Sequence, residues 1–258
     1  MDNNIISALL LTVFAGLSTG IGSFIALFAK RTNTKFLSLS LGFSAGVMLY
    51  VSMIEIFTKA KNYLVSANGV IPGNWICVAS FFGGIILIGL IDFFIPSTES
   101  DIGGKNNTNS LKRMGIMTSL AIAIHNFPEG MATFTSALKD PYLGIAIAVA
   151  ISIHNIPEGI ATSLPIYFST GKKIRAFLIS FLSGMTEPLG AIVGYLILRP
   201  FFNDTVFGVL FSAVAGIMVF ISLEELIPMA HEYEKSKITI IGVVIGMIVM
   251  AISLLLFI

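Results

Sequence analysis

Long apolar runs constrain this chain more than any other feature of its sequence. About 20 predominantly apolar residues form a helix that crosses a hydrocarbon core near 30 Å thick, and eight such runs alternate with polar breaks. They are Ile5–Phe28, Phe36–Phe57, Trp75–Ile95, Met114–Leu138, Tyr142–Phe168, Ile174–Leu198, Thr205–Met229 and Ile238–Ile258. A membrane β-barrel would show shorter segments of alternating polarity. The sequence therefore predicts an all-α integral membrane protein with eight transmembrane helices.

The composition agrees with a membrane domain. Of 258 residues, 55% are hydrophobic and 11% are charged, and the mean hydropathy is +0.93, whereas soluble domains carry about 25% charged residues. A net charge of +1 provides no basic surface for nucleic acid. The single cysteine, Cys77, excludes an internal disulfide and a cysteine-based metal site. We expect one transmembrane domain over residues 1–258, with a flexible polar loop from Pro96 to Arg113.

Lys and Arg are distributed unevenly between the two sets of loops. Cytoplasmic loops of membrane proteins hold an excess of these residues. Eleven of the 15 follow the first, third, fifth and seventh runs: Lys30, Arg31, Lys35, Lys105, Lys112, Arg113, Lys172, Lys173, Arg175, Lys235 and Lys237. The other loops hold Lys59, Lys61, Lys139 and Arg199. This bias predicts that both termini face outward.

The chain also contains internal repeats. Residues Ala121–Thr133 (AIAIHNFPEGMAT) and Ala150–Thr162 (AISIHNIPEGIAT) share ten of thirteen positions. Residues Ala45–Ile56 match Ala215–Leu226, which aligns Met48 with Met218, Ser52 with Ser222 and Glu55 with Glu225. A weaker match aligns Gly16 and Gly22 with Gly184 and Gly190.

These repeats predict an inverted architecture. The first predicted helix enters the membrane from outside and the sixth from inside, so the matched units run in opposite directions. The pattern is 3+2+3, with two central helices that copy each other, and it is typical of transporters that hold substrate near the membrane midplane. Reuse of small residues in membrane helices is an alternative for the weaker matches. It does not account for two HNxPEG motifs.

Acidic residues within the predicted spans indicate the chemistry that this chain carries out. Seven lie within the predicted spans: Glu55, Asp92, Glu129, Glu158, Glu187, Glu224 and Glu225. An intramembrane acid costs about 2.5–3.5 kcal/mol even on the lenient insertion scale, so it should face the interior and have a partner. No Lys or Arg lies at mid-span. We therefore interpret a metal cation as the partner.

The HNxPE motif places metal ligands on one helix face. His125 and Glu129 are four residues apart and Asn126 adjoins them, and His154, Asn155 and Glu158 repeat the arrangement. Imidazole with carboxylate suits zinc and Fe(II), and oxygen-rich sites also accept manganese. The absence of thiolate argues against a permanent structural zinc site.

Prolines accompany the ligands. Pro128 and Pro157 remove helix hydrogen bonds and are expected to kink or open their helices. An ordinary kink explains one such proline, but two at the same offset from His and Glu favour a site. Glu187 precedes Pro188 and is the expected ligand from a third helix.

Other residues allow two readings. Met48 is a thioether ligand or a packing residue. Glu224, Glu225 and His231, with Glu232 beside it, form an exit-side relay or a solvated helix end. For Glu55 and Asp92, which lie toward span ends, an ordinary structural role is favoured.

The paired HNFPEG and HNIPEG motifs, the GMTEPLG segment and the eight-span pattern resemble the ZIP (Zrt/Irt-like) divalent-metal transporters, in particular a bacterial branch, over essentially the whole chain. The resemblance implies a homodimer that takes metal into the cytoplasm across the inner membrane. It also implies a two-metal midplane site, formed by His125, Asn126, Glu129, His154, Asn155, Glu158 and Glu187, with Met48. Two departures stand out: residues 96–113 contain no histidine, and Glu224-Glu225 replaces a His-Glu pair of some relatives.

Two competing functions are less consistent with these motifs. An intramembrane metal-dependent hydrolase would carry H-E-x-x-H, which is absent, as is a Walker motif for ATP hydrolysis. A metal-selective channel remains an alternative to a carrier. The sequence does not rank zinc, iron, manganese, cobalt and cadmium as substrates, and it predicts no prosthetic group.

Overall fold

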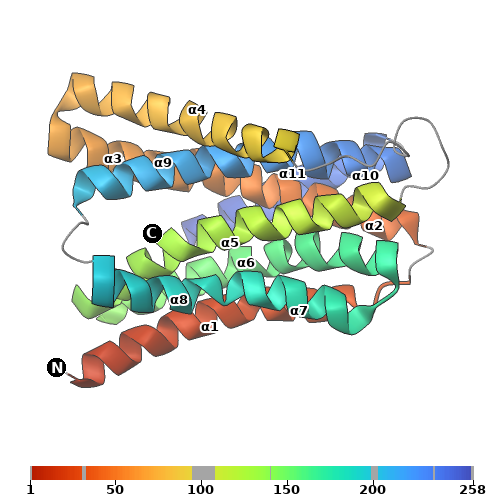
Figure 1. Ribbon diagram of the computed structural model, residues 1–258, viewed down its shortest axis with the longest axis horizontal. Helices are drawn as coiled ribbons and strands as arrows, with labels where there is room; N and C mark the ends of the chain where they lie inside the picture. The colour runs from red at the N-terminus through yellow and green to blue at the C-terminus, as the bar shows by residue number, and fades with distance from the viewer. Residues whose placement is uncertain are drawn as a thin grey trace.

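A computed structural model describes residues 2–30, 33–94, 108–139, 141–198, 203–234 and 236–256. Over these residues the protein is a bundle of long helices that run roughly side by side (Figure 1). The α-helices are α1 (Asp2–Ala26), α2 (Thr34–Tyr50), α3 (Phe57–Asn68), α4 (Val70–Phe94), α5 (Thr108–Lys139), α6 (Pro141–Thr170), α7 (Lys173–Gly184), α8 (Thr186–Val193), α9 (Asp204–Phe220), α10 (Ile227–Tyr233) and α11 (Ser236–Leu255). Three π-helical segments, η1 (Val51–Ile56), η3 (Gly194–Leu198) and η4 (Ile221–Leu226), join consecutive elements.

Six helical stretches of the described chain are long and apolar enough to cross a membrane. They are Asn4–Ala26, Thr34–Asn68, Val70–Phe93, Lys173–Ile197, Asp204–Tyr233 and Lys237–Leu255. Each corresponds to one of the predicted runs. Helices α5 and α6, which carry the HNxPEG motifs, are not among the six.

Two predicted boundaries differ from the structure. The second run was expected to end at Phe57, but the helical stretch continues to Asn68, because α3 is amphipathic and its polar residues do not interrupt the helix. The polar loop was expected from Pro96 to Arg113. Its residues 96–107 lie outside the described residues, and residues 108–113 form the beginning of α5.

The helices pack as two groups. The first bundle consists of α1, α5, α6, α7 and α8, and the second of α2, α3, α4, α9 and α11 with η1, η4 and α10. Where the bundles meet, α6 packs against α2, and α5 packs against α9 and η4. Ser44 of α2 donates a hydrogen bond to the Pro157 carbonyl at 2.9 Å and so joins the bundles beside a HNxPEG motif.

Glycines allow two close helix contacts in the first bundle. A Cβ on Gly22 of α1 would lie 1.9 Å from the Ile156 carbonyl oxygen of α6. A Cβ on Gly190 of α8 would lie 2.1 Å from the Phe127 carbonyl oxygen of α5. Phe127 and Ile156 hold the same position in the two HNxPEG motifs. The backbones of α1 and α8 therefore approach the two motif helices in the same way.

The two π-helical segments η1 and η4 occupy equivalent positions in the repeated sequence. In each, a serine at the second position bonds to the carbonyl of the preceding turn: Ser52 Oγ to Met48 at 2.6 Å, and Ser222 Oγ to Met218 at 2.8 Å. π-Helical turns within α-helices occur frequently at functional sites. Glu55 of η1 and Glu225 of η4 hold the fifth position of these segments.

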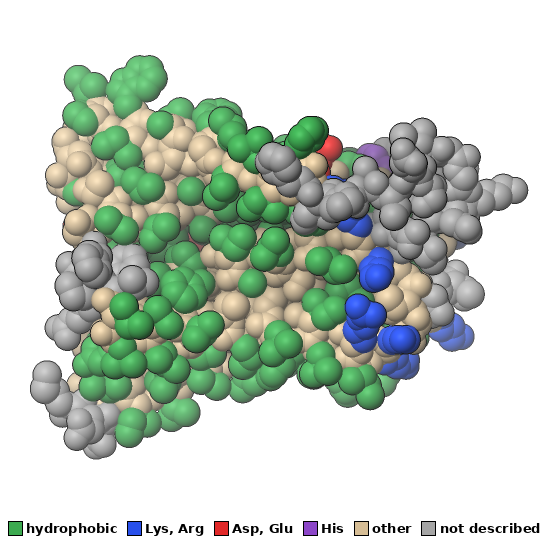
Figure 2. All heavy atoms as spheres, viewed as in Figure 1, with side chains coloured by type: hydrophobic (Ala, Val, Ile, Leu, Met, Phe, Trp, Pro, Cys, Tyr) green, Lys and Arg blue, Asp and Glu red, His purple; other side chains and the backbone are tan. Residues whose placement is uncertain are grey.

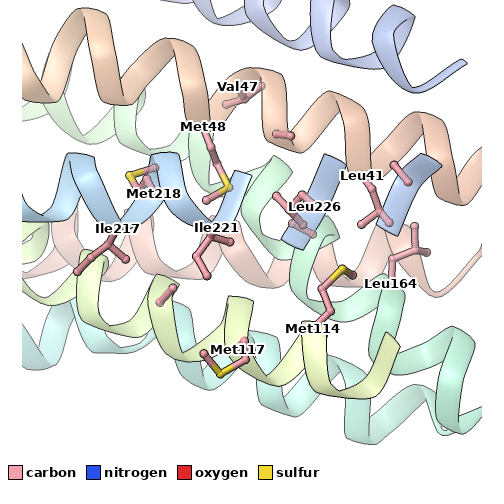
Figure 3. Close-up of a cluster of buried hydrophobic side chains, with 14 of the residues drawn as sticks. Leu41, Val47, Met48, Met114, Met117, Leu164, Ile217, Met218, Ile221 and Leu226 are labelled. Carbon is pink, nitrogen blue, oxygen red and sulfur yellow. The ribbon is translucent and has the colours of Figure 1, made fainter. Parts of the chain in front are cut away.

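Buried hydrophobic side chains fill the space where the bundles meet. Figure 3 shows Met48 of α2 beside Met218 and Ile221, with Met114 and Met117 of α5 nearby. Both bundles contribute to this cluster. Its α5 members Met114 and Met117 precede the HNxPEG motif of that helix.

Candidate metal site

The first HNxPEG motif and the second meet at Glu129. One carboxylate oxygen, Oε2, lies 3.0 Å from His125 Nε2 on the same helix, and the other, Oε1, lies 3.1 Å from His154 Nε2 on α6. One ligand atom from each of the three residues lies within 4.8 Å of the others. Both histidines are buried, whereas Glu129 retains 7% exposure. The predicted approach of the two motifs is therefore present in the fold.

Glu158 extends this cluster from α6. Its Oε1 lies 3.7 Å from His125 Nε2, and its side chain is fully buried. Neither carboxylate oxygen of Glu158 has a hydrogen-bond partner within the described chain. A buried carboxylate without compensating partners is strongly unfavourable. A cation beside it would supply the missing compensation.

The two asparagines are held in matching orientations. Asn126 Nδ2 donates to the Ser183 carbonyl of α7 at 3.3 Å, and Asn155 Nδ2 donates to the Ala15 carbonyl of α1 at 3.0 Å. The amide oxygens of both are buried and accept no hydrogen bond from the described residues. Each amide nitrogen is therefore anchored to a neighbouring backbone, which leaves the oxygen available as a ligand.

Glu187 lies where the sixth predicted helix breaks. Helix α7 ends at Gly184 and α8 begins at Thr186, so Glu187 occupies the first turn of α8, where a carboxylate is favoured. Its side chain is fully buried, and Oε1 accepts a hydrogen bond from Asn155 Nδ2. Its Oε2 lacks a partner in the described part of the chain.

Together these seven side chains form a buried, oxygen-rich constellation. Described contacts link His125, Glu129, His154 and Glu158 to one another and Asn155 to Glu187, while Asn126 is anchored to α7. The seven side chains offer two imidazoles, two amide oxygens and three carboxylates. The ion pairs described within it use only histidine as the basic partner. The donor set suits divalent cations that accept nitrogen and oxygen ligands.

The prolines of the motifs lie within continuous helices. Helix α5 runs through Pro128, and α6 runs through Pro157 and Pro165. The helical break instead occurs at Met185, three residues before Pro188. Because proline has no N–H, the helix loses a hydrogen bond just where Glu187 enters the cluster.

Among the described residues, no hydrogen bond or ion pair joins the remaining sequence candidates to this cluster. Met48 is buried in the hydrophobic cluster of Figure 3. Glu224 and His231 are exposed. Glu225 is buried and lies 3.8 Å from Arg113 Nη1, so the described ion pairs do not join it to His231.

Three acids, including Glu225, have basic partners that were not predicted from the sequence. Asp92 pairs with Arg113 of α5, and Glu55 pairs with Lys59 one turn further along the same helix at 2.7 Å. Arg113 was predicted to lie in a loop, so the prediction that intramembrane acids lack basic partners is wrong for Asp92 and Glu225. A fourth predicted run extended toward its N-terminus would have placed Arg113 among the helices.

Comparison with known proteins assigns the family. A family model described as ZIP Zinc transporter matches residues 95–254. The chain belongs to the ZIP family. It is 57% identical to the zinc transporter ZupT of Clostridium perfringens (strain 13 / Type A), over 99% of this chain and 98% of the relative. Identity is 58% to ZupT of Lysinibacillus sphaericus (strain C3-41), over 99% of both chains, and 57% to ZupT of Streptococcus mutans serotype c, over all of both.

Membership of the ZIP family excludes one of the sequence-based alternatives. ZIP proteins are transporters and not enzymes, so the intramembrane hydrolase is set aside. The apolar helices and the family together identify a multi-pass membrane protein.

Proposed function

We propose that this ZIP protein carries zinc across the membrane into the cytoplasm through the seven-residue site on α5, α6 and α8. The orphaned oxygens of Glu158, Glu187 and the two asparagines carry this proposal, because buried carboxylate and amide oxygens need a cation to compensate them. Relatives that match nearly end to end are named zinc transporters. Iron, manganese, cobalt and cadmium are further proposed substrates, since the same donors bind them.

We further propose that the site holds two cations. Seven ligands with three carboxylates exceed what one tetrahedral zinc uses, and Glu129, which lies against both histidines, would bind the first metal with them. One metal would bind His125 and His154, and the other would bind Asn126, Asn155 and Glu187, with Glu129 and Glu158 shared. Met48, which follows Ser44 by one turn on the helix that contacts α6, would supplement the site.

The eight-span inverted repeat is part of the proposal. Helices α5 and α6 contain 32 and 30 residues, enough to span a bilayer, and they are less apolar because they carry the ligands. The matched glycine contacts, the matched asparagine donors and the paired π-helical segments support the repeat. Each pair relates the first three helices to the last three.

The second bundle supplies further support for the repeat. A Cβ on Gly46 would lie 2.0 Å from the Val243 carbonyl oxygen, and a Cβ on Gly216 would lie 2.0 Å from that of Phe81. Gly46 and Gly216 are aligned in the repeated sequence. Equivalent glycines therefore bring α2 close to α11 and α9 close to α4.

The proposed orientation follows the charge distribution. Lys and Arg side chains gather at one end of the visible face, where α5 and α7 begin (Figure 2), and both marked chain ends lie toward the opposite end (Figure 1). We assign this basic end to the cytoplasm and the termini to the outer face of the cell membrane. A homodimer is proposed from the family resemblance alone.

Uptake by purified protein in proteoliposomes tests this function. Entry of external zinc into the vesicles is measured with a fluorescent indicator trapped inside them, for the unmodified chain and for Glu158→Gln. We expect saturable uptake that Glu158→Gln abolishes, while Asp204→Asn, at an exposed carboxylate beginning α9, retains it. Absence of uptake by the unmodified chain would refute the proposal. Counterflow of external zinc against preloaded zinc would distinguish a carrier from a channel.

A further inference from the structure

One basic side chain connects the two bundles outside the metal site. Arg113 lies near the beginning of α5, in the first bundle, and both of its acidic partners lie in the second. Its Nη2 donates to the Asp92 carboxylate and, at 3.2 Å, to the Asp92 backbone carbonyl near the end of α4. Its Nη1 lies 3.8 Å from Glu225 Oε1 in η4. Three helices therefore meet at one guanidinium.

This contact breaks the repeat. Glu225 aligns with Glu55 of η1, and each acid has a basic partner. The partner of Glu55 is Lys59 of the same continuous helix, so that pair lies within one bundle. The partner of Glu225 comes from the other bundle. Only the basic end of the molecule therefore has a described ion pair that resists separation of the bundles.

The same contact adjoins the buried hydrophobic cluster. Met114 directly follows Arg113, Leu226 directly follows Glu225, and both are fully buried. Figure 3 shows these two side chains with Leu41, Leu164 and Met117, all without solvent exposure. This cluster lies between the metal site and the basic end, and it contains residues of both bundles. A cation leaving the site toward that end must pass it.

We infer that Arg113, Asp92 and Glu225 form an ionic latch that keeps the basic end of the two bundles closed. The latch holds α5 against α4 and η4, and thereby keeps Met114 and Leu226 packed together. Opening toward the basic end requires that the guanidinium leave both acids. Separating the guanidinium from these acids is unfavourable, because it leaves partly buried charges without a partner. The inference rests on the proposed transport function and adds a device that controls it.

The test measures access to a buried reporter thiol. Thr118→Cys in a Cys77→Ala background provides the reporter, because Thr118 is fully buried and its hydroxyl lacks a partner among the described residues. It precedes His125 by seven residues and so lies on the same face of α5, two turns nearer the basic end. The protein is placed in lipid nanodiscs, where a water-soluble maleimide reaches both faces. The labelling rate is measured without metal.

We expect Arg113→Gln to raise the labelling rate by about tenfold or more, since a hydrogen bond between charged groups changes an equilibrium by at least roughly that factor. Lys59→Gln is the matched control, because Lys59 pairs with Glu55, the residue that aligns with Glu225 in the repeat. We expect it to leave the labelling rate unchanged. The exchanged pair, Arg113→Asp with Asp92→Arg, should restore slow labelling. Asp92→Asn should act in the same direction as Arg113→Gln.

Two outcomes would overturn the latch. One is equal labelling of Arg113→Gln and Lys59→Gln, in protein that elutes as a single species and still takes up zinc. The other is fast labelling that the exchanged pair does not reverse, because that would assign the effect to lost packing. Failure of the unmodified chain to transport zinc would refute the proposed function instead. The labelling result, measured without metal, is separate from it.

Discussion

At the scale of single residues, the chemistry of the proposed site comes from buried polar side chains whose oxygens lack hydrogen-bond partners. Glu158 and Glu187 are fully buried, and three of their four carboxylate oxygens lack a described hydrogen-bond partner. Hydrogen bonds hold the amide nitrogens of Asn126 and Asn155, while their amide oxygens also lack described hydrogen-bond partners. Burying these groups without a compensating charge costs free energy, and a bound divalent cation would offset that cost.

Glu187→Lys tests the two-metal arrangement. An ammonium at this position would occupy the place of the second cation and repel it. We expect equilibrium metal counting to fall from two zinc ions per chain to one, with transport retained at a changed rate or selectivity. Glu158→Ala should instead remove both, because Glu158 is proposed to bridge them. A single zinc in the unmodified chain would contradict the arrangement.

Metal affinity should depend on pH through the two histidines. Only deprotonated imidazole and carboxylate bind metal, so protons compete with zinc for His125 and His154. On acidification below roughly pH 6.5, the range of an ordinary imidazole, the affinity should fall by about tenfold per pH unit for each histidine that must lose a proton. Isothermal titration of zinc at several pH values measures this. A constant affinity from neutral to mildly acidic pH would exclude the histidines as ligands.

At the scale of helices, most of the architecture followed from the apolar runs, because lipid requires a long apolar helix wherever the chain crosses. The end of the second run and the start of the fourth were missed, since polar or amphipathic extensions such as α3 carry no such requirement. Within one motif, helical geometry predicted that His125 and Glu129 share a face. The pairing of Glu129 with His154 depends on how α5 docks against α6, which spacing along one helix does not specify.

Helix docking should depend on glycine at the closest contacts. Gly22→Ala would place a methyl group 1.9 Å from the Ile156 carbonyl oxygen, beside the proposed ligand Asn155, so α1 and α6 would have to separate. Such overpacking costs about 1–3 kcal/mol of the free energy of unfolding. Thermal denaturation of purified protein should show a lower Tm for Gly22→Ala. Gly83→Ala is the matched control, because its Cβ meets nothing within 4 Å; equal Tm values for the two variants would refute this docking.

At the scale of the whole molecule, two bundles of different character meet around one polar site. All seven proposed ligands belong to the first bundle, whereas the second contributes Met48, hydrophobic packing and the acids of the latch. On the proposed function, one bundle holds the substrate and the other encloses it. An arrangement of this kind allows access to change sides when the bundles move relative to each other, and the ligands need not be rebuilt.

The proposed orientation decides which side the latch controls. Starting from a Cys77→Ala chain, Ser97→Cys places a thiol between the third and fourth predicted runs, and Asn3→Cys places one near the N-terminus. From the excess of Lys and Arg at the basic end, a membrane-impermeant maleimide applied to whole cells should label Asn3→Cys and leave Ser97→Cys unlabelled until the cells are broken. The opposite pattern would invert the molecule. Uptake would then have to proceed past the latch before the site, so the latch would guard the entrance, and zinc transport toward the cytoplasm would require Arg113 to move first.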